Sequence, residues 1–561
     1  MRKVLFVAIN ARFTHTNLAL LYLNRLGRES SDSRIIEFTI SEEPLSILKE
    51  ISSFKPEIIA ISVYIWNSRL VRELVPEIKK VIPSVKLVLG GPEVSYNPQT
   101  WLSRYQHIDY IISGGGEHAW QVLLESDFQY PEKVIKLLNC SLNEIPFPYE
   151  GFDLNNFKNR IIYYEASRGC PFQCSYCLSS LGSTSLEYRD IRKVLPELKC
   201  FIDQKVPLVK FVDRTFNSDT QFTRRIWDFL ISHRKDTRFH FEINPLLISK
   251  EDITILKEVP EKLFQFEVGI QSTNEDTLKE INRSGNWQII RDNVEMLLKE
   301  TSIPIHLDLI FGLPHETFIS SQRSFNEIYN LKPDHFQPGM LKVLPGTPME
   351  ERAVEYELEY QQEPPYRILS NKWITFSELF ILQNMEHLVN NLYNSHRFTR
   401  SLAVMEQLMP SPFELYSELL AFWEKEKVNY WQKDWVKTAT LLAHYLSKKF
   451  PEEYEFLLDA LGWDLCSSSG LQYYPNLLLN DGIRELRYKW RRYLRENIDE
   501  LCCVFEVNKN ILHKGMVFKP GSDRFKEKYN LDDKACYLFL KGKDGFRKDI
   551  RFELSKLDMD V

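Results

Sequence analysis

The segment Arg168-Gly-Cys170-Pro-Phe-Gln-Cys174-Ser-Tyr-Cys177 places three cysteines within eight positions, directly after a short apolar run that ends at Ala166. A strand followed by such a loop is typical of functional residues at the carboxyl end of a barrel strand. Spacings of three and two intervening residues let the loop wrap three corners of a cuboidal cluster. Three thiolates can hold a [4Fe-4S] cluster and leave its fourth iron open to a small ligand. A closed zinc site is the alternative, and its fourth ligand would have to come from outside the loop, with Cys140 and Cys200 nearest.

The run before the cysteines is the first of six strand-like runs that alternate with helical stretches in residues 160–350. The six runs are Ile161–Ala166, Leu208–Val212, Arg238–Ile243, Leu263–Gly269, Pro304–Phe311 and His335–Leu344. Six βα units predict an open or partial (β/α)6 barrel. The chemistry of such a barrel lies at the carboxyl ends of its strands.

Residues 1–142 show another alternation of β-branched runs with amphipathic helical stretches. The five runs predict a parallel, doubly wound sheet of the flavodoxin-like kind, and they are Lys3–Ile9, Arg34–Ile40, Glu57–Trp66, Lys86–Gly90 and Asp109–Ser113. Gly90-Gly91-Pro92 follows the fourth run, and Gly114-Gly115-Gly116-Glu117 follows the fifth. Glycine permits close backbone approach, and such sheets bind ligands beyond the carboxyl ends of their strands. We therefore expect a large, flat ligand there.

Two further segments complete the predicted organisation. A proline-bearing connector, residues 143–159, joins the doubly wound domain to the barrel, and a charged stretch from Glu350 to Pro365 indicates a second linker. Residues 366–561 are predicted to be mainly helical, because apolar residues recur at three- and four-residue steps, with a small β appendage after about Val504. We expect this C-terminal domain to shape substrate choice or to cover the barrel mouth. The fold class is α/β with a helical C-terminal region.

The composition indicates a folded protein of several domains. The 561 residues are 43% hydrophobic and 26% charged, and 71 Lys and Arg against 77 Asp and Glu leave a formal charge of -6. This charge is too small to attract phosphate backbones broadly, so we do not expect nucleic acid as a partner. No apolar stretch approaches the roughly 18 residues of a membrane span. Nine cysteines without a disulfide-like distribution are typical of a cytoplasmic protein.

Motifs along the barrel resemble those of a known superfamily. The three cysteines, with aromatic Tyr176 before the last one, look like the signature of the radical S-adenosylmethionine (SAM) superfamily. Further blocks resemble the branch that includes oxygen-independent coproporphyrinogen oxidase and the cobalamin-binding members: Phe241-Glu-Ile-Asn-Pro245, Gly269-Ile-Gln-Ser272, Ile281-Asn-Arg283, Asp308-Leu-Ile-Phe-Gly-Leu-Pro-His-Glu-Thr317 and Leu344-Pro-Gly-Thr-Pro348. The resemblance implies a [4Fe-4S] cluster on Cys170, Cys174 and Cys177, whose open iron binds SAM and cleaves it to a 5'-deoxyadenosyl radical.

The same resemblance suggests which side chains hold SAM. Polar side chains at strand ends of an apolar barrel are costly unless they hold a ligand. By resemblance, Glu242 takes the methionyl amino group, Arg283 the carboxylate, and Gln271 and Asp308 the ribose hydroxyls, with Tyr176 also in the site. A structural hydrogen bond at a strand end is the alternative for each. Where many relatives carry a glycine-rich turn after the second strand, this chain has Asp213, which could share the amino-group contact.

The glycine groups of the N-terminal sheet resemble the turns that line the corrin in the cobalamin-binding branch, one of GGP type and one of GEGE type. The implied cobalamin contacts are Gly90, Gly91, Pro92, Gly114, Gly115, Gly116 and Glu117. No Asp-x-His-x-x-Gly pattern occurs, so cobalamin is expected to bind with its own base displaced and no histidine in its place. His15, after the first run, is on the same rim and could contact the corrin. A degenerate, empty domain is the alternative.

These motifs favour an enzyme in which the barrel makes the radical and the sheet domain presents cobalt to a substrate radical. The resemblance implies methyl transfer to an unactivated carbon of a small molecule or peptide, with an external electron donor such as flavodoxin or ferredoxin. A cobalamin-assisted rearrangement or oxidation is an alternative. A non-catalytic iron–sulfur sensory module would need the cysteines but could dispense with Gln271, Arg283 and Asp308, so their joint presence favours the enzyme. The sequence indicates no catalytic residue and no particular substrate.

Overall fold

The computed structural model describes residues 1–181, 186–283, 285–428, 434–468, 476, 481–532, 536–540 and 550–553. The chain divides into two compact units. Unit 1 comprises Met1–Asp334 and Pro338–Leu379, and unit 2 comprises His335–Gln337 and Phe380–Val561. Every candidate site residue lies in unit 1.

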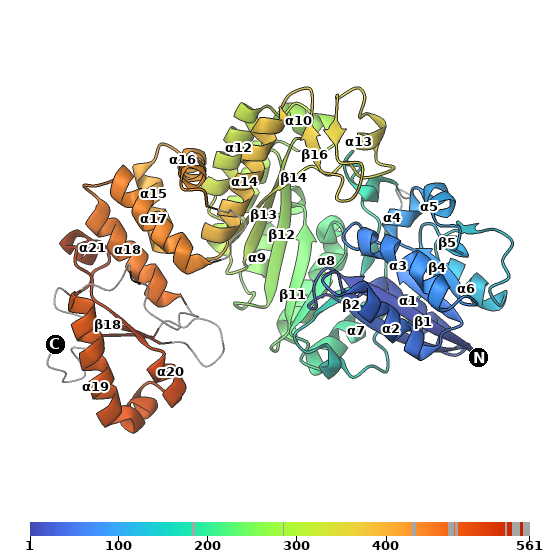
Figure 1. Ribbon diagram of the computed structural model, residues 1–561, viewed down its shortest axis with the longest axis horizontal. Helices are drawn as coiled ribbons and strands as arrows, with labels where there is room; N and C mark the ends of the chain where they lie inside the picture. Colours follow the sequence, from blue (N-terminus) through green and yellow to red (C-terminus); the bar gives the residue numbers. More distant parts are fainter. Residues whose placement is uncertain are drawn as a thin grey trace. The chain divides into compact units, whose positions relative to one another are not determined.

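A six-stranded sheet forms the N-terminal part of unit 1, in the order β2-β1-β3-β4-β5-β6 (Figure 1). Every neighbouring pair is parallel. This confirms the predicted doubly wound sheet and adds one two-residue strand, β6, that is too short to be recognised in the sequence. The strands are β1 Arg2–Asn10, β2 Ser31–Thr39, β3 Ile58–Ser62, β4 Lys86–Gly90, β5 Tyr110–Ile112 and β6 Val134–Ile135.

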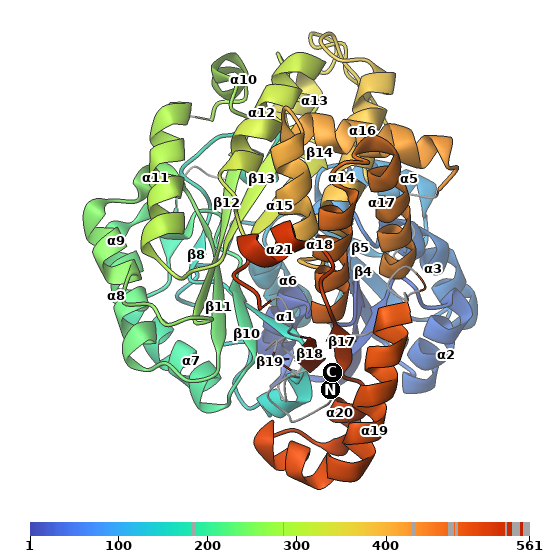
Figure 2. The same ribbon diagram turned by 90° about the vertical axis from the view of Figure 1, so that its left-hand side faces the viewer.

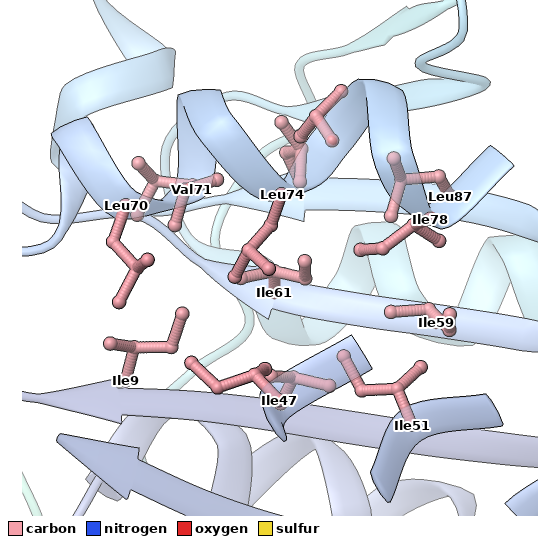
Figure 3. Packing of buried hydrophobic residues seen from close by; sticks show 14 of the residues in the cluster. Ile9, Ile47, Ile51, Ile59, Ile61, Leu70, Val71, Leu74, Ile78 and Leu87 are labelled. Atoms are coloured by element: carbon pink, nitrogen blue, oxygen red, sulfur yellow. The ribbon is translucent and has the colours of Figure 1, made fainter. Parts of the chain in front are cut away.

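Helices cover both faces of this sheet, so its central strands are continuous apolar runs rather than alternating ones. Leu5 and Val7 of β1 pack with residues of α2, α3 and α5, whereas Val4 and Phe6 pack with residues of α1 and α6 on the opposite face. Figure 3 shows the first of these layers, with Leu74 of α3 against the strands. The helices are α1 Leu18–Gly27, α2 Pro44–Phe54, α3 Ser68–Val81, α4 Pro92–Ser95, α5 Pro98–Arg104 and α6 Gly116–Glu125.

The second sheet has the order β14-β13-β12-β11-β10-β7 and stays open between its two edge strands, as the predicted partial barrel requires. Figure 2 shows α8, α9, α11 and α12 on the outer side of these strands. The strands are β7 Ile161–Tyr164, β10 Leu208–Phe211, β11 Arg238–Ile243, β12 Phe264–Gln271, β13 Ile305–Phe311 and β14 His335–Met340. The helices are α7 Ile191–Asp203, α8 Thr220–Ser232, α9 Lys250–Leu256, α10 Glu275–Glu280, α11 Trp287–Glu300 and α12 Phe318–Asn330.

The connector at residues 143–159 is anchored to the barrel. Ile145 and Tyr149 are buried, and the Tyr149 hydroxyl donates a hydrogen bond to the backbone oxygen of Tyr163 at 2.7 Å. Arg189 donates to the backbone oxygen of Ile145 at 2.9 Å. The stretch at residues 350–365 also has structure, because α13 (Pro348–Glu351) starts it and β15 (Glu359–Tyr360) pairs with β16 (Ile368–Ser370).

Unit 2 is mainly helical, as predicted, and ends in the antiparallel sheet β17-β18-β19. Trp463 packs against Phe518, Phe525 and Tyr537, which joins α18 to this sheet. Among the described residues, none of the helices has the length and apolar character to cross a membrane. The elements are α14 Phe376–Leu392, α15 Thr399–Leu408, α16 Pro412–Lys425, α17 Trp435–Lys449, α18 Tyr454–Ser467, α19 Asp481–Val504, α20 Lys509–His513, β17 Met516–Phe518, α21 Asp523–Lys528, β18 Tyr537–Leu540 and β19 Ile550–Glu553.

The packing of α3 predicts a large stability difference between two sites on this helix. Leu74 is fully buried and Val81 is 52% exposed. We expect Leu74→Ala to lower the free energy of unfolding by about 2–5 kcal/mol, because it leaves a cavity. Val81→Ala should change it by less than about 0.5 kcal/mol. Urea unfolding followed by circular dichroism measures both, and equal effects would contradict the assigned core.

Candidate functional site

The cysteine loop starts at the carboxyl edge of the barrel sheet, after β7 and the short strand β8 (Ser167–Arg168). Asp213, which follows β10, anchors its beginning. The Asp213 carboxylate accepts hydrogen bonds from the Ala166 amide at 3.0 Å and the Ser167 hydroxyl at 2.6 Å. Gly169 then turns the chain toward Cys170 with φ +104°, a conformation that glycine adopts without strain.

Asp213 is buried, and both of its oxygens accept hydrogen bonds from this segment. Burial raises the pKa of its carboxyl group to about 7, although the hydrogen bonds from Ser167 and Ala166 oppose the shift. In this structure Asp213 therefore supports the cysteine loop.

The loop is held against the carboxyl ends of later strands by polar contacts. The Ser175 amide donates to the backbone oxygen of Ile281 at 3.0 Å. Arg283 donates to the backbone oxygen of Gly269 and lies 3.8 Å from the Cys174 sulfur. Burial raises the pKa of Cys174, while the positive charge of Arg283 opposes this. Burial also raises the pKa of Tyr176, against the charge of the same arginine. Arg283 thus lies beside the loop, next to Tyr176.

The donor set fits an iron–sulfur cluster better than a closed zinc site. None of the nine cysteines, all of which lie in described parts of the chain, forms a disulfide. Cys140 donates to Gln121 of α6, and Cys200 accepts from Gln204 at the end of its own helix, α7. Within the described ranges, no three His, Cys, Asp or Glu side chains are gathered closely enough to hold a metal ion. The cluster prediction therefore rests on the three thiols of one loop, and not on assembled ligand geometry.

Three predicted SAM residues lie on neighbouring strands: Glu242 near the carboxyl end of β11, Gln271 at the carboxyl end of β12, and Asp308 in the middle of β13. One oxygen of Asp308, Oδ1, is buried and has no hydrogen-bond partner among the described residues. Burial, together with the negative charges of Glu267 and Glu242, raises the pKa of Asp308 well above its ordinary value. Burial and the charge of Glu267 also raise the pKa of Glu242. An unpartnered buried carboxyl oxygen is costly, and a ligand hydroxyl would satisfy it.

Gln271 has an unusual backbone that directs it toward Arg283. Its φ is +74°, and the register between β12 and β13 shifts between Gly269 and Gln271. A Cβ atom on Gly269 would lie 2.1 Å from the Gln271 Nε2 atom, so a larger residue there would displace the Gln271 side chain. Strained backbone of this kind gathers at functional sites. The structure thus brings Gln271, Arg283 and Cys174 together at one edge of the barrel.

The two glycine turns of the N-terminal sheet have different physical reasons for glycine. Gly91 has φ +101°, and a Cβ there would lie 2.5 Å from the backbone oxygen of Val63. The fold itself requires that glycine. Gly114 has φ +92°, yet a Cβ there would meet no heavy atom within 4 Å. The space beside Gly114 is open, which suits the flat ligand expected at this edge.

The neighbouring positions are more enclosed. A Cβ on Gly115 would lie 2.3 Å from the Asn139 side chain, whose oxygen accepts from the Gly115 amide at 3.1 Å. Gly116 begins α6. A Cβ on Gly90 would make only ordinary contacts, with Ile112 at 3.8 Å. Gly90 is the last residue of β4 and directly precedes the turn at Gly91 and Pro92. A side chain at Gly90 would therefore clash little with the rest of the protein.

His15 connects the two domains within unit 1. Its Nδ1 atom lies 2.6 Å from the Tyr163 hydroxyl of β7, and His15 forms a β-bridge with Ile161. Burial lowers the pKa of His15, and the positive charges of Arg12, Lys210 and Arg160 lower it further. The neutral imidazole therefore predominates at pH 7, and it is engaged by the barrel rather than by solvent.

Arg168 forms the second connection, two residues before Cys170. It pairs with Glu117 of α6 at 2.8 Å and with Glu165 at 2.7 Å. The second Glu117 oxygen, Oε2, is buried without a partner among the described residues. Burial opposes the charge on Arg168, but the carboxylates of Glu165 and Glu117 raise its pKa overall. The predicted cobalamin residue Glu117 is thus tied to the cysteine loop.

Lys210, His240 and Glu267, which match no motif in the sequence, form a polar group inside the barrel. The Lys210 ammonium and the His240 imidazole both lie 2.9 Å from one oxygen of Glu267. A signal exists in the sequence, because these polar residues interrupt otherwise apolar strands. Their shared location becomes visible only once the strand register is known.

Three family models match consecutive parts of the chain. A B12 binding domain model matches residues 4–124, a radical SAM superfamily model residues 164–323, and a model of a protein of unknown function, DUF4080, residues 354–529. The first two matches coincide with the two sheets of unit 1.

Individual relatives are distant. The chain is 24% identical over 410 residues to the cobalamin-dependent radical SAM methyltransferase TokK of Streptomyces tokunonensis, covering 64% of this chain and 58% of that protein. It is 24% identical over 368 residues to the 2-(S-pantetheinyl)-carbapenam-3-carboxylate methyltransferase of Streptantibioticus cattleyicolor, covering 58% of this chain and 52% of that protein. The chain thus spans little more than half of these curated relatives.

Solved structures support the fold. The cobalamin-dependent SAM radical enzyme OxsB, with aqua-cobalamin and SAM bound, has a TM-score of 0.58 at 14% identity, with 83% of this chain and 79% of that chain covered. The radical SAM methyltransferase TsrM of Kitasatospora setae, with cobalamin and a [4Fe-4S] cluster bound, has a TM-score of 0.53 at 16% identity, with coverage of 65% and 78%.

The two carboxylates on Arg168 predict a difference between matched variants. Glu117→Gln weakens the connection between α6 and the cysteine loop, whereas Glu165→Gln weakens only a pair within the barrel. We expect Glu117→Gln to destabilise the protein by about 1–3 kcal/mol and to speed proteolytic cleavage in residues 143–159. Glu165→Gln should leave that cleavage rate near the wild-type value. Indistinguishable cleavage patterns would show that the pair does not hold the two domains together.

Proposed function

Because the chain belongs to the radical SAM proteins that carry an N-terminal B12 binding domain, we propose that it is a cobalamin-dependent radical SAM enzyme that methylates an unactivated carbon of a small molecule. The observation that carries this proposal is the loop of three thiols at the carboxyl end of the first barrel strand, in the same compact unit as the glycine turns. Arg168 ties the two together.

The chain's own residues provide the binding groups. Cys170, Cys174 and Cys177 are the proposed thiolate ligands, and Asp213 holds the start of their loop in place. When bound, the cluster and SAM supply a 5'-deoxyadenosyl radical, and cobalamin supplies the methyl group. Tyr176, within the loop, lies close to Arg283.

The proposed SAM contacts follow from the charged side chains of the barrel and from a buried acceptor that has no hydrogen-bond partner among the described residues. Arg283 offers its cation to the methionyl carboxylate, and Glu242 offers a carboxylate to the amino group. Asp308 has the unpartnered oxygen that a ribose hydroxyl would satisfy, and Gln271 adjoins it across the β12–β13 pair. In the doubly wound domain, the turns at Gly90–Pro92 and Gly114–Glu117 form the proposed corrin rim. His15, whose Nδ1 atom is bonded to the Tyr163 hydroxyl, is proposed to pack near the corrin.

The proposal predicts that cluster and cobalamin can be lost separately. After anaerobic reconstitution with iron, sulfide and hydroxocobalamin, the wild type should show the absorbance of a [4Fe-4S] cluster and of cobalamin, and the reduced protein should convert SAM to 5'-deoxyadenosine. Cys174→Ala should abolish the cluster and SAM cleavage but retain cobalamin. Gly90→Val should retain the cluster and exclude cobalamin, because the turn loses its close backbone approach.

Absorption, paramagnetic resonance and mass spectrometry read these outcomes. Cleavage of SAM by Cys174→Ala, or zinc in place of iron in the wild type, would contradict the radical SAM part. Failure of the wild type to take up cobalamin would contradict the cobalamin part and leave a radical SAM enzyme with a vestigial sheet domain.

The SAM contacts predict weaker binding without loss of the cluster. Asp308→Ala and Gln271→Ala should each weaken SAM binding by about 1–3 kcal/mol, because polar partners on SAM stay unpaired. Asp334→Ala is the matched control, because Asp334 accepts from the Ile305 amide at the amino end of the same strand. It should lower stability but not SAM affinity. Isothermal titration of cluster-loaded protein with SAM measures these affinities. Unchanged SAM binding in both test variants would show that Asp308 and Gln271 do not contact SAM.

A further inference from the structure

One face of the barrel sheet is polar along most of its strands. The register places Tyr163, Lys210, His240 and Gln265 side by side on β7, β10, β11 and β12. A second row, one step toward the carboxyl ends, contains Glu242, Glu267 and His306. Paired residues of neighbouring parallel strands share a face, so both rows lie on the same side of the sheet.

The residues on the opposite face of the sheet show that the polar rows lie on its concave side. Phe264, Phe266, Val268 and Ile270 of β12 are buried, and the Phe266 ring stacks on Trp227 of α8 with centroids 5.8 Å apart. The apolar face therefore packs against the outer helices, and the polar rows line the concave side. In a closed barrel the interior is packed with branched apolar side chains. This sheet is open, and its concave side is not built to be filled in that way.

Lys210, Glu267 and His240 form a connected group on this face. The Lys210 ammonium lies 2.9 Å from Glu267 and 3.6 Å from Glu242, and His240 binds the same Glu267 oxygen at 2.9 Å. The side chains of Lys210, Glu242 and Glu267 are still 25%, 25% and 23% exposed. These three charged side chains are therefore partly exposed, whereas the His240 side chain is only 8% exposed and contacts Glu267.

The group is distinct from the proposed SAM contacts but adjoins them. Lys210 and His240 lie one row further from the cysteine loop than Glu242. A protonated lysine has three hydrogen-bond donors. The Lys210 ammonium donates to Glu267, whereas Glu242 at 3.6 Å is an ion-pair partner beyond hydrogen-bond distance. Glu267 and Glu242 provide acceptors close by. The face therefore offers both donors and acceptors directly below the proposed SAM site.

We propose that Lys210, Glu267 and His240 are substrate-recognition residues, and that the substrate is a polar, water-soluble small molecule with hydrogen-bond donors and acceptors. An apolar substrate, such as a lipid or a hydrophobic ring system, would remove water from these partly exposed charged groups without replacing its hydrogen bonds, which is unfavourable. This inference rests on the proposed function, because it takes the concave face as the place where the substrate meets the radical.

The test uses the organism that encodes the protein. The gene is deleted and restored as wild type, Lys210→Met, the double variant Lys210→Met/Glu267→Gln, or the control Lys299→Met. Lys299 lies on α11 with its side chain 71% exposed, outside the barrel. Cells are extracted with chloroform, methanol and water, and both phases are compared by mass spectrometry. The single variant leaves the Glu267 carboxylate without its lysine partner, and the double variant removes that charge as well. The cluster absorbance of the purified variants shows whether they are folded.

We expect the compound that accumulates in the deletion strain to be in the aqueous phase. Lys299→Met should clear it, whereas both Lys210 variants should convert it about tenfold less, the effect of one lost hydrogen-bonding partner. By equilibrium dialysis, the purified compound should bind Lys210→Met about tenfold more weakly than the wild type.

Three results would overturn the inference: accumulation in the organic phase, no accumulating compound in the aqueous phase, or full clearance by the folded double variant. The proposed methyl transfer is tested separately by mass. Its product should exceed the accumulated compound by one CH2 group, and any other mass difference would reject methylation without changing the polarity of the substrate.

Discussion

In a parallel sheet whose outer face is covered by helices, a polar side chain has few places to be. It can lie at the carboxyl edge, where the loops begin, or on a face that the helices leave uncovered, because elsewhere it would be buried without a partner. Both sheets of unit 1 follow this constraint. The N-terminal sheet is covered on both faces and presents its functional turns at Gly90–Pro92 and Gly114–Glu117. The barrel sheet is covered on one face, so it uses its edge and its concave side.

The same constraint makes the connection between the two domains specific. The carboxyl edges are joined by Arg168, which binds Glu117 of one domain and Glu165 of the other, and by the contact of His15 with Tyr163. A charge pair that is largely buried tolerates little change in geometry, because either partner alone is costly. The position of the glycine rim is thereby coupled to the segment that leads into the cysteine loop.

The fold could be predicted from the sequence because the hydrophobic periodicity and the turn residues between elements gave strong signals. Apolar runs with intervening amphipathic stretches located eleven of the twelve strands that form the two large sheets, while β6 has only two residues and carries no pattern. The cysteines and the Asp308 segment stand out as motifs.

The contacts that individual residues make could not be predicted in the same way. That Asp213 supports the loop, that His15 faces Tyr163, and that Gly91 is required by Val63 depend on contacts between residues distant in the chain. The polar rows of the barrel were visible only as interruptions, since a register must be known before separate strands can be seen to share one face.

The concave face also shows how several acids can share one small region. Glu267 carries the fixed charge: burial opposes it, but the His240 hydrogen bond and the Lys210 charge hold its pKa at about 2. That charge, added to burial, raises the pKa of Glu242 and of Asp308. A raised pKa makes each of these two acids easier to protonate than an ordinary carboxyl group. A cationic group bound at Glu242 would lower the pKa of Glu242 again, because an opposite charge favours the carboxylate. Proton affinity on this face therefore rises from Glu267, next to Lys210 and His240, to Glu242 and Asp308, closer to the cysteine loop.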